Sequence, residues 1–273
     1  MNRLSLVVLL ASLVLPVSSH AFSEELSPRG TAHVAEKGSW SVGVFGPLKV
    51  AVRDGLELEL HPLFALASPH VTARVAHGGI ACLWLTGEYG ISVPTPGLRL
   101  LKGTFFPEWS MSDENIGWFL VPSAALLVSR GEESVTTMRL GLALGVPVGQ
   151  NDAIPLDSYA PLDLLLAPAL TGMRLRFGVA QDHRLSSRLR GRAGADVWLV
   201  GASPDPPRSR LYVSARAGLD VALGASTRLA VGAAWFNSDQ RRTIIRVDED
   251  GFATRVPRRS NDFFPTLDLV WER

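Results

Sequence analysis

The stretch that decides the fold reads Met173-Arg174-Leu175-Arg176-Phe177-Gly178-Val179, and it resumes as Arg188-Leu189-Arg190-Gly191-Arg192-Ala193-Gly194-Ala195-Asp196-Val197-Trp198-Leu199. Apolar residues alternate with polar residues, mostly arginines, along both runs. A period of two is the period of a β-strand, because successive side chains leave opposite faces of the pleated backbone. The polar segment at 181–184 is the predicted turn. The two runs therefore predict one long hairpin with an apolar face and an arginine face.

The same alternation recurs along most of the chain. Between Trp40 and Trp271 about twelve runs follow this pattern, with ten as the alternative count. The longer runs reach roughly 10 to 13 residues, which exceeds the ~5 to 6 residues of a soluble strand and matches the ~9 to 11 of a tilted membrane strand. We therefore predict an all-β chain that crosses a membrane.

The connections between these runs are sorted by length. Short turns are expected at 53–55, 78–79, 130–133, 181–184 and 224–227, and they alternate with long connections at 61–70, 91–117, 147–168, 201–209 and 237–261. Only Gly46-Pro47 breaks the rule. Short turns at one rim and long loops at the other are typical of a closed antiparallel transmembrane β-barrel, with both chain ends on the periplasmic side.

The free-energy cost of placing an arginine in lipid indicates which way the arginine face points. An arginine that points into lipid near the midplane costs about 2 to 4 kcal/mol, so these side chains should face the lumen. They predict either an ion-pair network that fills a narrow barrel or a basic path for anions. The predicted lumen-lining residues are Arg139, Arg174, Arg176, Arg188, Arg190, Arg192, Arg216, Arg228, Glu57, Glu59, Asp196, Asp220 and Asp268.

The N-terminus reads as an export signal. A short basic start precedes an apolar run from Leu4 to Val17, which is shorter than the ~20 residues of a spanning helix, and Ser19-His20-Ala21 supplies the small residues of a cleavage site. The predicted segments are a signal peptide at 1–21 cleaved between Ala21 and Phe22, a periplasmic lead-in at 22–39, and the barrel at 40–273.

Composition excludes several classes of protein. A net charge of +1 gives no support to nucleic-acid binding, and 47% hydrophobic residues are too many for a disordered chain. The single cysteine, Cys82, cannot form a disulfide within the chain and is expected to pack within a strand. The acidic turn at 248–251 lacks the ligand spacing of a calcium loop. We expect no metal and no cofactor.

The last strand carries a family resemblance. Pro265 to Trp271 alternates apolar residues and ends on an aromatic residue, and it is similar to the C-terminal assembly signal of outer-membrane β-barrel proteins of Gram-negative bacteria. Glu272-Arg273 depart from that signal, in which the aromatic residue is usually last. The resemblance implies a porin-like envelope barrel in the outer membrane, in contact with lipopolysaccharide and with the barrel-assembly machinery during biogenesis.

The sequence leaves more than one function open. The first hypothesis is a narrow channel or transporter for small anionic solutes, and the alternative is a structural or surface-interaction barrel with a plugged lumen and long extracellular loops. A remote alternative is a barrel hydrolase. Its candidate residues are His61 and His70 at the outer rim. Ser68 and Asp54 are the nearest hydroxyl and acid in the sequence, but Asp54 is expected at the opposite rim. Since no signature of a barrel enzyme is visible, we expect a protein that is not an enzyme.

Overall fold

The computed structural model describes residues 26–104, 115–150, 160–202, 210–247, 251 and 253–273. The predicted signal peptide and its cleavage site lie outside these ranges, and so does most of the acidic turn at 248–251.

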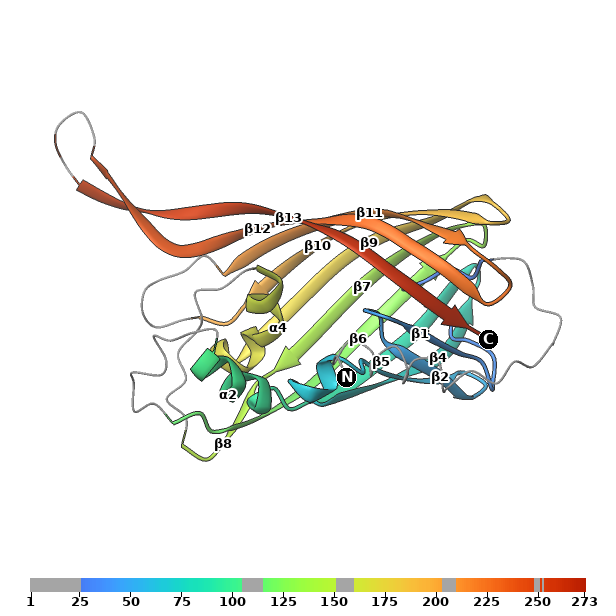
Figure 1. Ribbon diagram of the computed structural model, residues 1–273, viewed down its shortest axis with the longest axis horizontal. Coiled ribbons are helices and arrows are strands. Elements are labelled where there is room, and N and C mark those ends of the chain that lie inside the picture. The colour runs from blue at the N-terminus through green and yellow to red at the C-terminus, as the bar shows by residue number, and fades with distance from the viewer. Residues whose placement is uncertain (1–25, 105–114, 151–159, 203–209, 248–250, 252) are drawn as a thin grey trace, which may run out of the picture.

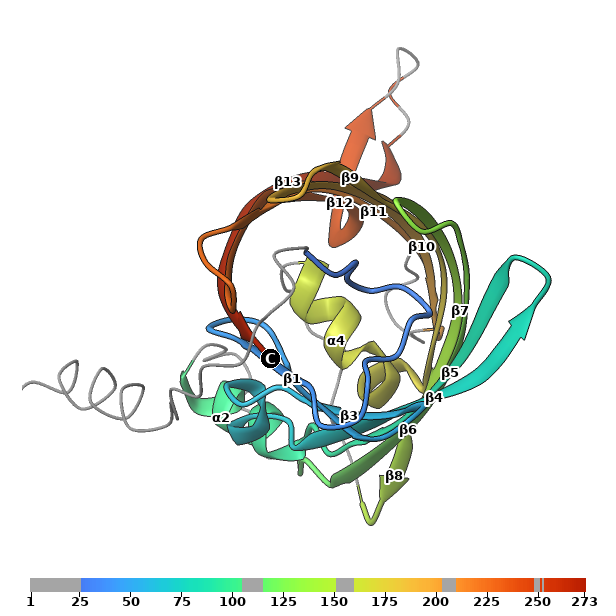
Figure 2. The ribbon, with the colours of Figure 1, turned by 90° about the vertical axis from the view of Figure 1, so that its right-hand side faces the viewer.

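Twelve antiparallel strands form a closed barrel, which confirms the predicted fold class. Strand β1 pairs with β13 and so closes the ring, with Val42 opposite Trp271 (Figures 1 and 2). The strands are β1 (Trp40–Gly43), β2 (Leu48–Arg53), β3 (Leu56–Leu60), β4 (His70–Ile80), β5 (Leu83–Ser92), β6 (Trp118–Arg130), β7 (Ser134–Leu144), β9 (Met173–Ser186), β10 (Leu189–Val200), β11 (Leu211–Ala222), β12 (Thr227–Val247) and β13 (Ala253–Glu272).

A thirteenth strand is a continuation rather than a new turn of the barrel. Strand β8 (Val146–Val148) follows β7 after a break at Gly145 and pairs with the outer end of β6. Glycine is required at this position, because a Cβ at Gly145 would lie 1.8 Å from the carbonyl oxygen of Pro168. Pro168 belongs to the helix α4 (Ala160–Thr171), which approaches the strand here.

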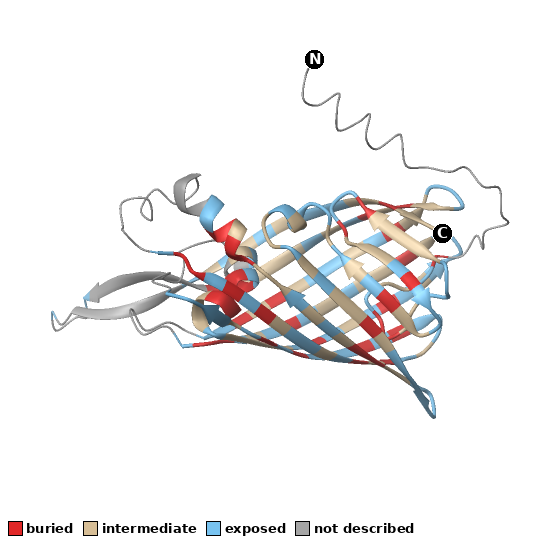
Figure 3. Ribbon diagram, turned by 90° about the horizontal axis from the view of Figure 1, so that it is seen from below, coloured by how far each residue is buried: buried red, intermediate tan, exposed pale blue. Residues whose placement is uncertain are grey.

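The two faces of the strands are arranged as the alternation predicts. Phe177, Val179 and Val197 are exposed on the outside, whereas Arg190 and Asp196 are buried inside. Figure 3 shows the resulting alternation of exposed and buried residues along the strands. Where two strands pair along their length, the ladder satisfies backbone groups without water, and the apolar exterior suits lipid.

The long connections gather at one end of the barrel, and the chain end at Arg273 lies at the other (Figure 1). The outer end carries the helices α2 (Thr95–Thr104) and α4, and the short 3-10 helix η1 (Phe64–Leu66). Strands β12 and β13 continue beyond the barrel as a hairpin, so much of the predicted loop at 237–261 is paired strand. None of the helices in the described ranges is both long and apolar enough to span a membrane.

Two predicted turns are wrong in position. Strand β4 continues through the glycines at 78–79 to Ile80, because Gly78 has a φ of +88° and absorbs a register shift as a bulge. Cys82 is consequently exposed at the turn rather than packed in a strand. Strand β9 likewise continues through 181–184 to Ser186, which brings Asp182 to the lumen opposite Arg192.

Candidate functional site: an arginine-lined chamber

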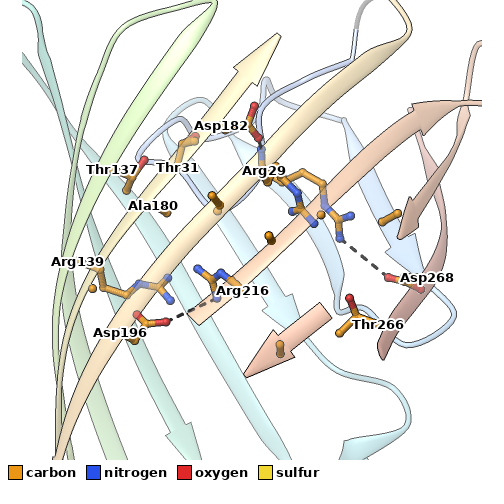
Figure 4. Close-up of a pocket in the computed structure, with 18 of the residues that line it drawn as sticks. Arg29, Thr31, Thr137, Arg139, Ala180, Asp182, Asp196, Arg216, Thr266 and Asp268 are labelled. Carbon is orange, nitrogen blue, oxygen red and sulfur yellow. Dashed lines mark hydrogen bonds and ion pairs between the residues drawn. The ribbon is translucent and has the colours of Figure 1, made fainter. Parts of the chain in front are cut away.

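The barrel encloses a cavity of about 880 Å³. Its wall is formed by strands on several sides, and its floor includes Arg29, Gly30 and Thr31 from the segment that precedes β1. Figure 4 shows charged side chains from different strands pointing into the space. The charged residues that line it are Arg29, Lys49, Arg74, Arg139, Arg176, Arg192, Arg216, Glu59, Glu88, Asp182, Asp196 and Asp268. We call this cavity the chamber.

Residues 26–32 lie inside the periplasmic end of the barrel, and we call them the plug. Its backbone is bound by side chains from the wall: the guanidinium of Arg190 donates to the carbonyl of Leu26 at 3.1 Å, and that of Arg74 donates to the carbonyl of Thr31 at 2.5 Å. The amide of Ala32 donates to the hydroxyl of Ser129 at 2.7 Å. Because these bonds come from separate strands, the plug crosses the mouth rather than lying along one wall (Figure 2).

Arg228 is the most buried anchor of the plug, with a side chain that is 0% exposed. It donates to the carbonyl of Ser27 at 3.0 Å and to the hydroxyl of Ser27 at 2.8 Å. It also pairs with Asp220 at 3.3 Å and with Glu272. A buried charge is tolerated only when it is paired and hydrogen-bonded, so Arg228, the two acids and the plug form one unit.

The outer end of the lumen holds helix α4, which lies inside the ring of strands in Figure 2. Leu164 and Ala167 pack with Val200 and Tyr212 of the wall. Because the helix is apolar along most of its length, it needs apolar contacts on more than one side. Arg174 donates to the carbonyl of Leu164 and so ties the helix to β9.

Much of the charged wall is internally paired. Arg74 donates to Glu57 at 2.7 Å and to Glu88 at 3.2 Å, and Arg139 contacts Glu88 at 2.6 Å. Lys49 lies 3.2 Å from Glu59 on the neighbouring strand. These groups stiffen the wall and neutralise one another.

A second set of guanidinium groups is less completely paired with carboxylates. Asp196 is held closely by Arg176 at 2.8 Å, and its second oxygen is 3.9 Å from Arg216, whose side chain is 55% exposed. Figure 4 shows Arg139 and Arg216 pointing toward one another above Asp196. Nε of Arg192 lies 3.3 Å from a carboxylate oxygen of Asp220, which makes an ion pair without the geometry of a hydrogen bond. Positive charge therefore exceeds its local compensation around Arg216.

The predicted lumen residues lie at different depths in the structure. Arg139, Arg176, Arg192, Arg216, Glu59, Asp196 and Asp268 line the chamber. Glu57, Arg190, Asp220 and Arg228 are buried in the wall or beneath the plug, and Arg174 lies under α4. The prediction for Arg188 is wrong, because it is exposed just before β10, in the turn that 181–184 was expected to form.

Several chamber residues were not predicted. Lys49 and Arg74 stand on the polar parity of their strands and could have been included on that signal. Asp182 was assigned to a turn, and it pairs with Arg190 at 2.5 Å. Arg29 lies in a segment without periodicity, so no signal in the sequence pointed to it. Its guanidinium is 4.0 Å from Asp268.

The histidines considered for catalysis are occupied by backbone contacts. The amide of His61 donates to Nε2 of His70 at 3.0 Å, and Nδ1 of His70 contacts the carbonyl of Ser68 at 2.9 Å. Asp54 lies at the opposite rim, where it accepts from the amide of Lys37 at 3.4 Å. These four residues therefore do not assemble a catalytic group. Among the described residues no cluster of three or more His, Cys, Asp or Glu side chains could hold a metal ion.

Comparison with known proteins finds likeness in structure alone. No family model matches the chain, and no curated protein sequence matches it. A closed barrel with an apolar exterior and a charged interior decides the class of fold. The chain has the fold of bacterial outer-membrane β-barrel proteins.

Three solved barrel structures are similar to this chain at very low identity. OmpT of Vibrio cholerae is 8% identical with a TM-score of 0.45, over 83% of this chain and 64% of that one. LpxR from Salmonella typhimurium is 9% identical with a TM-score of 0.41, over 86% and 90%. A FadL homologue of Pseudomonas aeruginosa is 11% identical with a TM-score of 0.36, over 86% and 68%.

One prediction about this outer-membrane barrel needs correction. We expected a protein that is not an enzyme, and that exclusion is wrong, because the similar barrels include an enzyme, the lipid A deacylase LpxR. The physical reason is that an active site needs only a few side chains on a barrel wall, so neither the architecture nor a missing sequence signature excludes one. An enzymatic activity is therefore no longer excluded for this chain, and none is assigned to it.

Proposed function

We propose that this outer-membrane barrel transports small anionic solutes, with the chamber as the binding site and the plug as the gate at the periplasmic mouth. The observation that carries the proposal is the incomplete compensation of Arg216. Its nearest acid, Asp196, is already bound by Arg176, and the guanidinium is more than half exposed to the chamber.

The chamber supplies what an anion needs. Two unit charges ~4 Å apart attract by about 4 kcal/mol at an effective dielectric constant of ~20, compared with about 1 kcal/mol in water. Arg192 and Arg139 approach the same space and offer planar groups that match carboxylate and phosphate oxygens. The acids that remain, Glu59 and Asp268, keep binding moderate, which release requires.

The plug suits the role of a gate. It is attached to the wall by hydrogen bonds and ion pairs and not by a strand ladder, so it can leave without opening the barrel. Its displacement would connect the chamber with the periplasm. The gate is thus separate from the selectivity, which rests on arginines of the wall.

The test is single-channel recording of the full-length protein in planar bilayers under a salt gradient. We expect brief openings with an anion-favouring reversal potential, and longer openings for Arg228→Ala, which loosens the plug. The double variant Arg192→Ala and Arg216→Ala should lose the anion preference and still conduct, while Arg53→Ala, at the exposed last residue of β2, should behave as wild type. Silence of both the wild type and Arg228→Ala would refute transport.

A second candidate is a structural or surface-interaction barrel whose lumen stays filled. The observation in its favour is that elements occupy both ends of the lumen, the plug at one and α4 at the other. The same recordings separate the two, because a structural barrel remains silent when Arg228 is replaced, provided that heat-modifiable gel migration shows the variant barrel to be folded.

A further inference from the structure

The wall of the barrel is incomplete on one side. Strands β1, β2 and β3 have 4, 6 and 5 residues, whereas a tilted strand needs ~9 to 11 to cross the apolar layer. They begin at the periplasmic rim, where Ser41 lies opposite Glu272, and end partway across. Figure 1 shows β1 and β2 confined to one half of the barrel, while β7 and β9 run along its length.

Strand β13 consequently has an edge without a ladder above the short strands. In the described pairings its contact with β1 ends at Gly43 opposite Val270, followed by one bond from the amide of Val44 to the carbonyl of Leu269 at 3.0 Å. Because backbone direction alternates, Leu267 and Pro265 aim their backbone groups into the gap. Proline has no N–H, which suits an edge position.

Two loops cover this gap, residues 43–47 and residues 61–69, and we call them together the lid. Its apolar side chains are exposed: Phe45 is 63% exposed, Phe64 50% and Leu66 86%. On a barrel in a membrane such side chains meet acyl chains. Open backbone edges are tolerated at membrane depth only beside protein or a water-filled cavity, so the lid and the chamber behind it must together satisfy the gap.

The lid is bonded both to helix α2 and to β13. The amide of Gly97 in α2 donates to the carbonyl of Ala67 at 2.5 Å. Nε2 of His61 contacts the carbonyl of Phe45 at 2.5 Å and joins the two loops of the lid. The amide of Phe45 donates to the Asp268 carboxylate at 2.9 Å, and this is a side-chain contact with β13 in place of a ladder. The same carboxylate lies 4.0 Å from Arg29 in the chamber. An anion that reaches Arg29 would therefore compete with the Asp268 carboxylate, which fastens the lid, for the Arg29 guanidinium.

The chamber reaches this gap from within. Its lining includes Phe45 and Pro47 of the lid and Pro265 to Asp268 of β13, together with Arg192 and Arg216. A molecule lying between β13 and the lid would have its apolar part among Phe45, Leu267 and lipid, and its polar end toward the guanidinium groups.

We propose that the gap between β13 and β4, above β1 to β3, is a lateral portal through which an amphiphile with an anionic head group passes between the membrane and the chamber. The proposal rests on the proposed function, because it takes the chamber as the anion site and names the solute as a head group on an acyl chain. Carboxylate and phosphate head groups share the required chemistry.

The test is competitive photolabelling of the full-length protein in phosphatidylcholine nanodiscs with a diazirine-bearing dodecanoate. We expect label on residues 43–47 and 61–69 that falls at least fivefold with a tenfold excess of dodecanoate or dodecyl phosphate, and not with neutral dodecyl maltoside. The stronger competitor identifies the head group. Val197, on the lipid face of β10, is the control and should keep its label.

A second measurement separates the two proposals. Inorganic phosphate should protect Arg216 from modification by phenylglyoxal if the chamber binds anions. Protection by phosphate, combined with lid label that does not respond to anionic competitors or responds as Val197 does, overturns the portal and leaves the chamber. Absence of both effects overturns the portal together with the chamber.

Discussion

Replacement of Arg228 by alanine should release the plug while leaving the barrel closed. The guanidinium makes two hydrogen bonds to Ser27, at 3.0 and 2.8 Å, and hydrogen bonds from a charged group contribute about 1.5 to 3 kcal/mol each. The plug therefore loses about 3 kcal/mol or more of docking free energy. Since 1.4 kcal/mol is a factor of ten, the open population should rise by about 100-fold.

The assay is hydrogen exchange with mass spectrometry of the full-length protein in nanodiscs. Exchange of a peptide covering 26–36 should accelerate by about 100-fold, because the amides of Arg29 and Ala32 lose their partners Asp182 and Ser129 when the plug leaves. Amides in the ladder between β7 and β9 should not change. Arg53→Ala, at the exposed last residue of β2, is the matched control.

Breaking a buried pair by removing one partner costs about 3 to 5 kcal/mol, because Asp220 keeps its charge, and part of that cost falls on the barrel. Heat-modifiable gel migration therefore accompanies the exchange measurement. A folded Arg228→Ala barrel in which 26–36 exchanges at the wild-type rate would show that Arg228 does not hold the plug.

Two further predictions concern the elements inside the lumen. Burial lowers the pKa of His33 below its ordinary value of about 6.5, with Arg74 acting in the same direction and Glu132 opposing it, so the released state binds the proton more readily. The protection of the plug amides, measured relative to their intrinsic exchange rates, should therefore decrease as pH falls below about 6.5. His33→Phe should keep the ring contact with Trp84 and remove this dependence, and an unchanged pH profile would contradict the assignment. Gly145→Ala places a Cβ 1.8 Å from the Pro168 carbonyl and should lower the Tm by several degrees. Gly224→Ala, which has open space around the added Cβ, is the control and should not lower the Tm. Equal Tm values for the two variants would mean that α4 shifts freely.

The barrel was predictable because its signals are local and periodic. Alternation along runs such as Met173 to Val179 assigns the inside and the outside, and the cost of an arginine in lipid decides which is which. Strand ends were less predictable. Polar residues at 181–184 look like a turn, yet Asp182 is polar because it faces the lumen.

The filling of the lumen was not predictable from local pattern. Residues 26–32 have no period, because their backbone is bound by side chains such as Arg74, Arg190 and Arg228 that are distant in sequence. The apolar run within α4 was expected to extend a strand or lie against the rim, and tertiary contact with Val200 and Tyr212 makes it a helix in the lumen. Periodicity therefore predicts the strands of the wall but not the segments that lie inside the lumen.

The plug also constrains the order in which the molecule can assemble. Its anchors come from both halves of the strand order, with Arg74 on β4 and Arg228 on β12. Residues 26–32 precede all of these strands in the chain, yet their binding site exists only after β12 and β13 have joined the sheet. The first described residues are therefore among the last to reach their final contacts, because those contacts require strands that lie far apart along the chain.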